Sequence, residues 1–397
     1  MKILAISYLF PNSQYPNYGI FVLNRLKALQ KYCDLKVINP IQWFPFLSHF
    51  SRYHNYNKIP QYECIQGIDV YHPRFPSIPR YMKSIDSLSY TLAIVALVQR
   101  LNKEFNFDLI DLHWTYPDLP AGVLLSSLTG KPFLTTLRGH EAFYLDEPGI
   151  RKKIVSYCLQ KSSHIIALSR KLLTAAVDSG CNENKIQVIR NGVDGRKFAH
   201  IPKAEARAHL GLPADVRIIL SVGSLIYGKG FDRIIAALKK RITILYPDVR
   251  LYLAGSEGAA GCYKKELMQQ IDQFNLQKHV FFTGEIKNTD LMHWYNAADL
   301  FCLASRREGS PNVLTEALCC GCPAVATDVG SVADIMSENH LGFVVPNQDN
   351  ILEGLLLGLG TSFDRQSIAR HMSKYDWDWC AQQVISVYQH VLNKESE

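Results

Sequence analysis

Short apolar runs alternate with longer segments of helical periodicity over the first half of the chain. The apolar runs are typical of buried strands, and the segments between them carry apolar residues at the spacing of one helix face. Strands are expected at residues 2–8, 35–39, 109–114, 133–137 and 164–168, and helices near residues 21–32, 85–105 and 121–128. Because strands that alternate with helices form parallel sheets covered on both faces, this half is expected to be an α/β domain.

The second half repeats the pattern after a polar stretch that ends in Gly211 and Pro213. Its strands are expected at residues 216–222, 251–255, 280–284, 298–304 and 323–327, and a final amphipathic helix near residues 379–392. A chain of 397 residues is too long for one ordinary core. We therefore expect a first domain at 1–195, a linker at 196–213, a second domain at 214–375 and a terminal helix at 376–397.

Residues 41–83 mix aromatic side chains with cations and prolines and lack clean periodicity. This composition predicts loops around short strands. Aromatic rings beside cations suit a membrane interface or a lipid-linked acceptor. They also suit stacking on sugars or the packing of a long loop onto its domain, so these alternatives stay open.

Composition is that of a globular protein, with 47% hydrophobic and 20% charged residues. The opening run, MKILAISYLF, is too short for a signal peptide and no cleavage site follows it. No apolar stretch approaches the roughly 18–20 residues that span a bilayer, and a cytoplasmic protein is expected. Ten cysteines without paired spacing do not form a disulfide scaffold. Cys319, Cys320 and Cys322 are interpreted as small buried residues of a helix–strand turn rather than as metal ligands.

The net charge of +7 is concentrated in the first half. Residues 1–195 hold 22 Lys and Arg against 14 Asp and Glu, whereas the remainder holds 21 against 22. This imbalance suggests an anionic partner or membrane surface for the first half, beside the simpler interpretation of a moderately basic surface.

The most informative stretch, residues 296–330, reads NAADLFCLASRREGSPNVLTEALCCGCPAVATDVG. An apolar strand opens into a polar loop that holds Glu308, and Glu316 follows eight positions later. In a parallel sheet such a loop lies at the carboxyl ends of the strands, where ligands bind.

A helix is expected from Asn312 to Cys320, directly after Ser310. Pro311 is expected at its first position, where proline is favoured because its missing N–H would have no partner there. The first amides of such a helix, near Asn312 and Val313, favour an anionic group such as a diphosphate.

The loop after the strand at 216–222 reads GSLIYGKG, from Gly223 to Gly230. It nearly matches a P-loop, but Gly230 stands where the Mg²⁺-binding Ser or Thr would be, and a nucleoside triphosphatase is disfavoured. Gly223 and Lys229 are instead candidates for contact with phosphate.

Polar residues also follow strands of the first half. His113 ends one strand, and Arg138 and His140 follow another, which places all three at the ligand-facing edge of the expected sheet. Gly19, in the long loop after the first strand, would allow the backbone to approach a ligand.

The segment EGSPNVLTEALCCGCPAVATDVG, with its two glutamates, resembles the signature of retaining family 4 glycosyltransferases with the GT-B fold. The resemblance covers most of residues 1–390 and is strongest over 216–346. It implies two Rossmann-like doubly wound domains that face a central cleft, with a C-terminal helix that crosses back to the first domain. The donor would be held mainly by the second domain and the acceptor by the first.

The resemblance also implies roles for single residues. Lys229 would contact the diphosphate of a sugar nucleotide, Glu316 the ribose hydroxyls, and Glu308 the donor sugar and its anomeric carbon. The family often has an arginine where Ser224 stands, so a second cation is needed, and Arg138 is one candidate.

The loop at Gly284 would lie near the nucleoside, and His113 and His140 on the acceptor side. Family members often carry two glycines near Gly19, so this loop is expected to differ. No metal is needed if Lys229 and the helix replace it; the Asp376-Trp377-Asp378 spacing follows no predicted strand and is interpreted as a helix start.

The expected function is transfer of a sugar from a UDP- or GDP-sugar to a saccharide or lipid-linked saccharide, as in cell-surface or exo-polysaccharide biosynthesis. Peripheral membrane contact through the basic first domain fits this function, and nucleic acid is not an implied partner. A sugar-nucleotide epimerase or hydrolase is the alternative on the same fold. An inactive nucleotide-sugar-binding protein is a further alternative, against which Glu308, Glu316 and Lys229 argue. A dehydrogenase is disfavoured because no well-placed G-x-G-x-x-G occurs.

Overall fold

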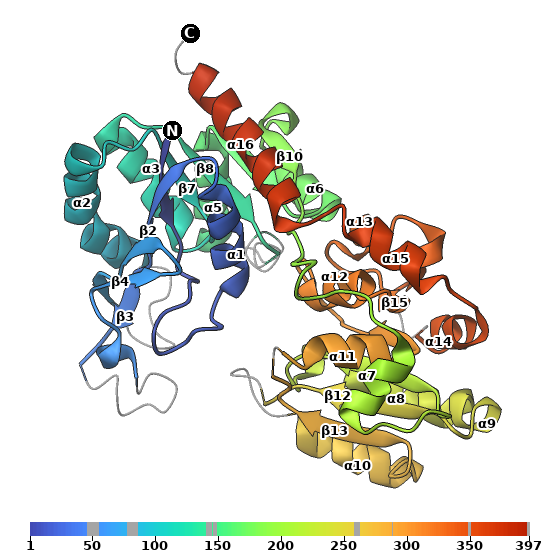
Figure 1. Ribbon diagram of the computed structural model, residues 1–397. Helices are drawn as coiled ribbons and strands as arrows, with labels where there is room; N and C mark the ends of the chain where they lie inside the picture. The colour runs from blue at the N-terminus through green and yellow to red at the C-terminus, as the bar shows by residue number, and fades with distance from the viewer. Residues whose placement is uncertain are drawn as a thin grey trace. The chain divides into compact units, whose positions relative to one another are not determined.

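The structure, a computed structural model, describes residues 1–45, 55–77, 86–139, 145, 149–257, 263–287, 289–347 and 351–394. The chain forms two compact units (Figure 1). The first unit contains Met1–Gly192 together with Trp377–Glu397, and the second unit contains Val193–Asp376. Each unit is an α/β structure with its own mainly parallel sheet, as the alternation of strands and helices predicts.

The first unit is built on an eight-stranded sheet with the order β10-β9-β8-β7-β1-β2-β5-β4. Its strands are β1 (Lys2–Ile6), β2 (Asp34–Ile38), β4 (Tyr62–Ile65), β5 (Ile68–Tyr71), β7 (Leu109–Leu112), β8 (Phe133–Leu137), β9 (His164–Ala167) and β10 (Ile186–Val188). Strand β4 is antiparallel to β5, and β3 (Ile41–Trp43) pairs separately with β6 (Arg74–Pro76). The aromatic and basic region thus contributes two strands to the central sheet, where the sequence predicted loops around short strands.

Helices cover both faces of this sheet. They are α1 (Ile20–Leu29), α2 (Asp86–Glu104), α3 (Asp118–Thr129), α5 (Ile150–Lys161), α6 (Arg170–Asp178) and α16 (Trp377–Lys394). Side chains of β1 alternate between two cores: Leu4 and Ile6 pack with α2 and α3, and Ile3 and Ala5 pack with α1 and α16. Because both faces are covered, the strand is apolar from Ile3 to Ile6.

Helix α16 belongs to the first unit although the whole second unit precedes it in the chain. It packs along α1, as Figure 1 shows with α16 in red. At its start, Asp378 accepts from Lys31 Nζ at 2.6 Å and from the Tyr32 hydroxyl at 3.1 Å. Asp378, the second aspartate of Asp376-Trp377-Asp378, therefore stabilises the start of a helix, as the sequence predicts.

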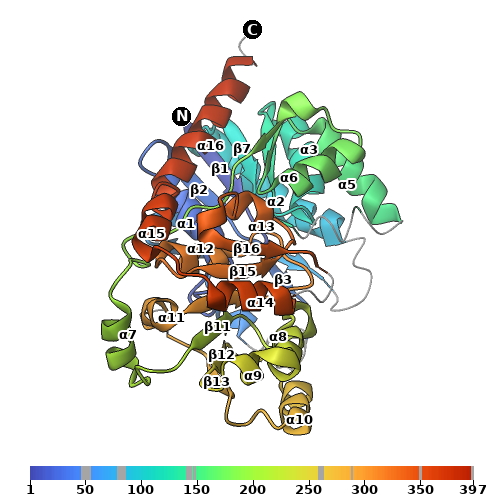
Figure 2. The ribbon, with the colours of Figure 1, turned by 90° about the vertical axis from the view of Figure 1, so that its right-hand side faces the viewer.

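The second unit has a fully parallel six-stranded sheet with the order β13-β12-β11-β14-β15-β16. Its strands are β11 (Ile218–Val222), β12 (Arg250–Ala254), β13 (Val280–Gly284), β14 (Leu300–Leu303), β15 (Ala324–Thr327) and β16 (Gly342–Val345). Its helices are α7 (Lys203–Leu210), α8 (Phe231–Ala237), α9 (Thr243–Leu245), α10 (Lys264–Phe274), α11 (Leu291–Ala297), α12 (Asn312–Cys319), α13 (Val332–Ile335), α14 (Ile351–Gly360) and α15 (Arg365–Met372). Figure 2 shows α14 packed against β15 and β16.

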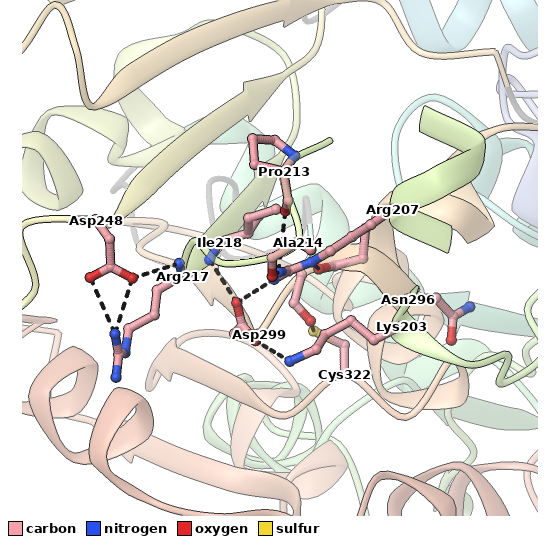
Figure 3. A network of polar contacts seen from close by, with 12 residues as sticks. Lys203, Arg207, Pro213, Ala214, Arg217, Ile218, Asp248, Asn296, Asp299 and Cys322 are labelled. Carbon is pink, nitrogen blue, oxygen red and sulfur yellow. Dashed lines mark hydrogen bonds and ion pairs between the residues drawn. The ribbon is translucent and has the colours of Figure 1, made fainter. Parts of the chain in front are cut away.

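The segment predicted as a linker, residues 196–213, is instead a folded part of the second unit. It contains α7, and Figure 3 shows how buried Arg207 anchors this helix. The guanidinium donates to Asp299 Oδ2 at 2.7 Å and to the carbonyl of Ala297 at 3.0 Å. Lys203 Nζ reaches the other Asp299 oxygen at 2.7 Å. The polar residues that suggested a linker form these ion pairs, in which Arg207 is buried and Asp299 is partly buried, so the linker prediction is wrong.

Each sheet has one point where the strand order reverses. In the first unit the chain runs from β1 through β2 to β5, and then continues from β7 on the other side of β1. In the second unit it runs from β11 through β12 to β13, and then continues from β14 on the other side of β11. Loops diverge at the carboxyl ends of such neighbours and leave a crevice for ligands, so these points are where binding sites are expected.

Candidate active site

Lys229 and Glu308 meet at the reversal point of the second sheet. Lys229 ends the short 3₁₀-helix Tyr227–Lys229 after β11, and Glu308 lies in the loop after β14. Lys229 Nζ donates to Glu308 Oε1 at 2.7 Å, and the Ser305 hydroxyl donates to the same oxygen at 2.7 Å. The side chains are 25% and 11% exposed, so both retain access to a ligand.

Gly230 brings these two loops together. It has a φ of +67°, and a Cβ at this position would lie 1.9 Å from the carbonyl oxygen of Ala304 at the end of β14. Only glycine fits this conformation and this approach. The structure thus explains why glycine stands where a P-loop requires Ser or Thr.

Gly223, at the start of the same loop, packs beneath the Lys229 side chain. Its N–H donates to the Ala254 carbonyl at 2.9 Å, and a Cβ would lie 3.4 Å from Lys229 Cδ. The predicted phosphate-contact residues Gly223 and Lys229 are therefore neighbours in space. Their contact with phosphate stays a prediction.

Arg306 links the loop after β11 to the loop after β14. This role was not predicted from the sequence. Its guanidinium donates to both oxygens of Asp232, at 2.8 and 2.6 Å, and lies 3.8 Å from the ring centroid of Tyr227. Its backbone N–H donates to the Gly228 carbonyl at 2.8 Å. Bidentate pairing of this kind fixes orientation as well as distance. Arg306 therefore fixes the segment that carries Lys229 relative to the loop that carries Glu308.

The loop that carries Glu308 is also held from its other side. Gly330, with a φ of +52°, approaches so closely that a Cβ would lie 2.2 Å from the Gly309 carbonyl oxygen. The Ser331 N–H donates to the same carbonyl at 2.9 Å, and the Ser331 and Ser310 hydroxyl oxygens are 3.0 Å apart. Glu308 and Ser310 thus sit on a loop positioned by three separate strand ends.

Helix α12 begins at Asn312, and Pro311 is its N-cap residue in an extended conformation. The sequence predicted a helix from Asn312 to Cys320 with Pro311 where it begins, so the start is confirmed and the helix ends one residue earlier than predicted, at Cys319. The amides of Asn312 and Val313 fall in the first turn of α12, at the positive end of the helix dipole. An anion could accept from such groups, which is the role predicted for them.

Glu316 is oriented by a buried tyrosine that the sequence did not single out. The hydroxyl of Tyr295, on α11, donates to Glu316 Oε2 at 3.0 Å, and burial raises the pKa of both groups. Among the described residues, Glu316 Oε1 has no hydrogen-bond partner. A ligand hydroxyl could donate to this oxygen, and the ribose contact stays a prediction.

His113 and Arg138 form a buried pair in the first unit. Arg138 donates through Nε to the His113 carbonyl at 3.0 Å, and its NH2 nitrogen lies 2.8 Å from His113 Nδ1. Because an arginine N–H can only donate, Nδ1 accepts and the ring proton of neutral His113 lies on Nε2. That nitrogen is 2.9 Å from Asp111 Oδ2, and Oδ2 accepts from the Tyr388 hydroxyl of α16 at 2.5 Å.

This network determines the charge states of its members. Burial lowers the pKa of His113 and outweighs the effect of Asp111. Burial alone would raise the pKa of Asp111, but His113 and Tyr388 hold it below its ordinary value. Asp111 therefore stays ionised and His113 stays neutral near pH 7. Both imidazole nitrogens face protein groups in this arrangement, which suits a residue that orients Arg138.

The remaining predicted positions differ in their surroundings. Gly19 has a φ of +72°, and a Cβ would lie 2.7 Å from the Leu9 carbonyl group, so its small size serves the packing of its own loop. Gly284 has a φ of +73° with nothing within 4 Å of such a Cβ, which leaves space beside it. His140 lies outside the described residues.

The three clustered cysteines at the end of α12 are buried, as the helix–strand turn predicts. Burial raises the pKa of Cys319 to about 12 and that of Cys322 to about 11. Both are therefore neutral thiols near pH 7, and such groups are poor metal ligands and poor nucleophiles.

Comparisons with known proteins agree with these observations. Residues 50–196 match the family described as Glycosyltransferase Family 4, and residues 202–357 match Glycosyl transferases group 1. The two matches fall on the first and the second unit. A protein of Bacillus subtilis named as a teichuronic acid biosynthesis glycosyltransferase, TuaC, is 29% identical over 359 residues, which cover 89% of this chain and 87% of TuaC.

Solved structures with the same fold span nearly the whole chain. Anabaena HepE in complex with UDP matches with a TM-score of 0.73 at 22% identity and covers 98% of this chain and 100% of HepE. HepE has also been solved with UDP-glucose. Sucrose-phosphate synthase from Thermosynechococcus elongatus matches with a TM-score of 0.80 at 19% identity and covers 99% of this chain and 100% of the synthase.

These neighbours share the GT-B fold, and the two family matches follow one another along the chain. The chain therefore belongs to the group 1, family 4 glycosyltransferases of the GT-B fold and is an enzyme that transfers glycosyl groups.

Proposed function

We propose that the protein moves a sugar from a UDP- or GDP-sugar to an acceptor hydroxyl, with retention at the anomeric carbon and without a metal ion. The observation that carries this proposal is the Lys229–Glu308 pair at the reversal point of the second sheet. A cation and a carboxylate at one ligand-binding edge match the opposite charges that develop when a sugar leaves a diphosphate. The UDP and UDP-glucose in the HepE structures support a nucleotide-sugar donor.

The chemistry requires charge stabilisation more than a nucleophile. As the bond from the anomeric carbon to the phosphate oxygen breaks, negative charge grows on the diphosphate, where Lys229 and the first amides of α12 are aimed. Glu308 stabilises the positive charge at the anomeric carbon. The acceptor oxygen forms the new bond from the same face, and its proton passes to the leaving phosphate. A lysine has three N–H donors, so Lys229 can hold Glu308 and a phosphate oxygen together.

On the acceptor side we propose His113 and His140. Because both ring nitrogens of His113 face protein groups, its contribution is the orientation of Arg138, which we propose as the second cation. Glu316 accepts from the ribose hydroxyls while Tyr295 holds its other oxygen. TuaC, by its name a protein of teichuronic acid biosynthesis, supports a cell-surface saccharide as the acceptor.

The donor is tested by thermal stabilisation against a panel of UDP- and GDP-sugars, with and without EDTA. A ligand that binds only the folded state stabilises it by RT ln(1 + [L]/Kd), so the true donor should raise the melting temperature. We expect a shift with one sugar nucleotide that EDTA does not change. A shift abolished by EDTA contradicts the metal-free mechanism, and no shift with any nucleotide contradicts the donor assignment.

The epimerase or hydrolase alternative is separated by the products. The donor that stabilises the protein is incubated without an acceptor and followed by ¹H NMR at the anomeric proton. A transferase leaves the donor largely intact, whereas an epimerase converts it to a second sugar nucleotide. With acceptor present, the anomeric coupling constant of the first product distinguishes retention from inversion.

We also propose that the first unit contacts an anionic membrane surface through the layer of α2, α3 and α5. These helices pack side by side and expose large apolar side chains: Leu88, Leu92, Leu124, Leu128, Ile150 and Tyr157. Exposed Lys152 and Lys153 on α5 add positive charge. No helix in the described ranges is both long and apolar enough to cross a bilayer.

Vesicle co-sedimentation tests this contact. We expect binding to phosphatidylglycerol vesicles, weaker binding to phosphatidylcholine vesicles, and loss of binding in the variant Lys152→Glu with Lys153→Glu. The matched control replaces Lys239 and Lys240, which are exposed on the second unit. Equal vesicle binding by the Lys152/Lys153 variant and the Lys239/Lys240 control would contradict the assignment of the membrane contact to α5.

A further inference from the structure

Glu308 accepts two hydrogen bonds on one oxygen of its carboxylate. Lys229 Nζ and the Ser305 hydroxyl both donate to Oε1, each at 2.7 Å. Within the part of the chain that the structure describes, Oε2 of the same carboxylate has no hydrogen-bond partner, and the Glu308 side chain is 11% exposed. The oxygen that can accept from a ligand is therefore Oε2, and its direction depends on the two donors that hold Oε1.

The two donors differ in what else they can bind. Lys229 is partly exposed and carries a positive charge, so an anionic ligand at the same edge of the sheet attracts it. Ser305 is fully buried, and its hydroxyl has a single proton to donate, which goes to Glu308. Ligand binding therefore leaves the bond from Ser305 unchanged, whereas Lys229 has to be shared between Glu308 and the ligand.

The backbone around Ser305 is fixed by both neighbouring strands. The Thr327 hydroxyl, at the end of β15, donates to the Ser305 carbonyl at 2.6 Å. From the other side, the Ser221 hydroxyl of β11 donates to the carbonyl of Cys302 in β14 at 2.7 Å. These side chains are buried, and a buried polar group that loses its partner is costly. The end of β14 thus presents the Ser305 hydroxyl in one position.

The proposed reaction draws Lys229 and Glu308 toward different groups. Negative charge grows on the diphosphate as the sugar leaves, and this charge attracts Lys229. Glu308 has to stay beside the anomeric carbon at that moment, because a carboxylate that followed Lys229 would approach a diphosphate of the same charge sign. A hydrogen bond from a buried hydroxyl to an ionised carboxylate is suited to hold it, since bonds to charged groups are the stronger class.

We propose that Ser305 is a positioning residue: it holds Glu308 Oε1 while Lys229 contacts the diphosphate, so that Oε2 faces the donor sugar. This assignment rests on the proposed transferase function and adds to it a group that does not touch the substrate. The two donors on Oε1 then have different tasks. Lys229 serves binding of the diphosphate, and Ser305 serves the rate.

Ser305→Ala tests the assignment through a split between rate and binding. The rate is the release of nucleoside diphosphate from the sugar nucleotide that stabilises the protein, with UDP-glucose as the first probe. Binding is the Kd of the nucleoside diphosphate alone. We expect kcat to fall about ten- to hundredfold, as for a lost hydrogen bond to a charged group, and this Kd to change less than about twofold.

The matched control is Ser221→Ala, which removes an equally buried hydroxyl that supports the same strand without touching Glu308. Its kcat should stay within about twofold of the wild-type value. A wild-type kcat in Ser305→Ala overturns the proposal. An equal loss of rate and of diphosphate affinity also overturns it, because such a loss indicates general damage to the site.

A double-mutant cycle separates positioning from general support of the fold. In Glu308→Gln the stabilising charge is already gone, so adding Ser305→Ala should lower kcat by less than about threefold more. A hydroxyl that only supported the fold would lower kcat by the same factor in both backgrounds. Effects that multiply in this way contradict the positioning role.

Melting temperatures identify a variant that does not fold. If Ser305→Ala is such a variant, Thr327→Val takes its place, because it keeps the shape of the side chain and removes the bond to the Ser305 carbonyl. Its kcat should fall while the Kd of the nucleoside diphosphate stays, and an unchanged kcat overturns the proposal.

Failure of the proposed function gives a different result. In that case no sugar nucleotide binds, or Glu308→Gln turns over at the wild-type rate. If only the positioning role is wrong, Glu308→Gln is impaired and Ser305→Ala stays active.

Discussion

Lys229 Nζ and Glu308 Oε1 lie 2.7 Å apart. In the proposed reaction Lys229 stabilises negative charge on the diphosphate, and Glu308 stabilises positive charge at the anomeric carbon. The pair holds each side chain at the reversal point before a ligand binds. Because it is partly exposed, it contributes at most about 1 kcal/mol to stability. Its removal should therefore affect turnover far more than folding.

Glu308→Gln keeps the size and an accepting oxygen of the side chain but removes its charge. We expect kcat to fall on the order of a hundredfold or more, because the positive charge at the anomeric carbon loses its stabilising partner. The free energy of unfolding in urea should change by less than about 1 kcal/mol. The control is Glu338→Gln, at an exposed position of the second unit. Turnover near the wild-type rate would refute the role of Glu308.

Lys229→Ala should weaken binding of the donor, and the loss should be larger at low ionic strength, where the charges are less screened. Isothermal titration with the sugar nucleotide at two salt concentrations measures both effects. Lys278→Ala is the control because Lys278 is exposed before β13, at the amino end of that strand. An affinity that stays at the wild-type value at both salt concentrations would refute the diphosphate contact.

Gly230→Ala forces a side chain into a left-handed conformation against the Ala304 carbonyl. We expect a loss of about 1–3 kcal/mol in unfolding free energy, together with weaker donor binding because Lys229 is displaced. Gly228→Ala is a matched control two residues away, where a Cβ would meet nothing within 4 Å. An equal unfolding free energy of the two variants would show that the fold does not need the close approach of Gly230 to the Ala304 carbonyl.

Tyr388→Phe removes the hydroxyl that donates to the buried Asp111 carboxylate. A buried charge that loses a donor typically costs about 1–3 kcal/mol of stability. Tyr32→Phe removes a hydroxyl that also donates to a carboxylate, that of Asp378, but Tyr32 is 41% exposed. Water can replace that bond, so the control should lose less than about 1 kcal/mol. Urea unfolding of both variants measures the difference.

Asp118 links stability to pH. It is fully buried and accepts from the Tyr90 hydroxyl at 2.7 Å and from the Tyr8 N–H, yet burial outweighs these donors and raises its pKa to about 8. Between its ordinary value near 4 and about 8, the folded state holds a proton that the unfolded state has lost. The contribution of Asp118 to stability is therefore complete below about pH 4 and decreases as the pH rises to about 8.

Asp118→Asn cannot ionise, so its unfolding free energy should vary less between pH 5 and pH 8 than that of the wild type. Denaturant titrations at several pH values measure this dependence. Asp34→Asn, at an exposed position, should follow the wild-type profile. If the unfolding free energy of Asp118→Asn depended on pH as that of the wild type does, Asp118 would already be ionised in the folded protein at pH 5.

The sheets and the loops at their edges were predictable because the sequence signals are local. Strand β1 is apolar from Ile3 to Ile6 since it is buried on both faces, and the Glu308 loop is bounded by a strand and a helix that each have a clear period. The signature around Glu308 and Glu316 was enough to predict that both residues lie at one edge of one sheet. These predictions needed no contact between distant residues.

What escaped prediction depends on partners that are distant in sequence. Tyr388 and Asp111 are 277 positions apart, and Arg306 and Asp232 are 74 apart. No local pattern indicates such pairs. Helix α7 was interpreted as a linker for the same reason, because Arg207 is polar in sequence but buried against Asp299 in the fold. Tyr295 was missed because a tyrosine in an amphipathic helix looks like ordinary core.

The return of α16 to the first unit has a consequence for the order of synthesis. Residues 193–376 leave the ribosome before residues 377–394, so the second unit has its whole sequence first. Until then the apolar face of the first sheet that carries Ile3 and Ala5 lacks Val384 and Tyr388 of α16. Exposed apolar surface of this kind favours aggregation and attracts chaperones. Although domains commonly fold from the amino terminus onward, in this protein the amino-terminal unit is the last to be completed.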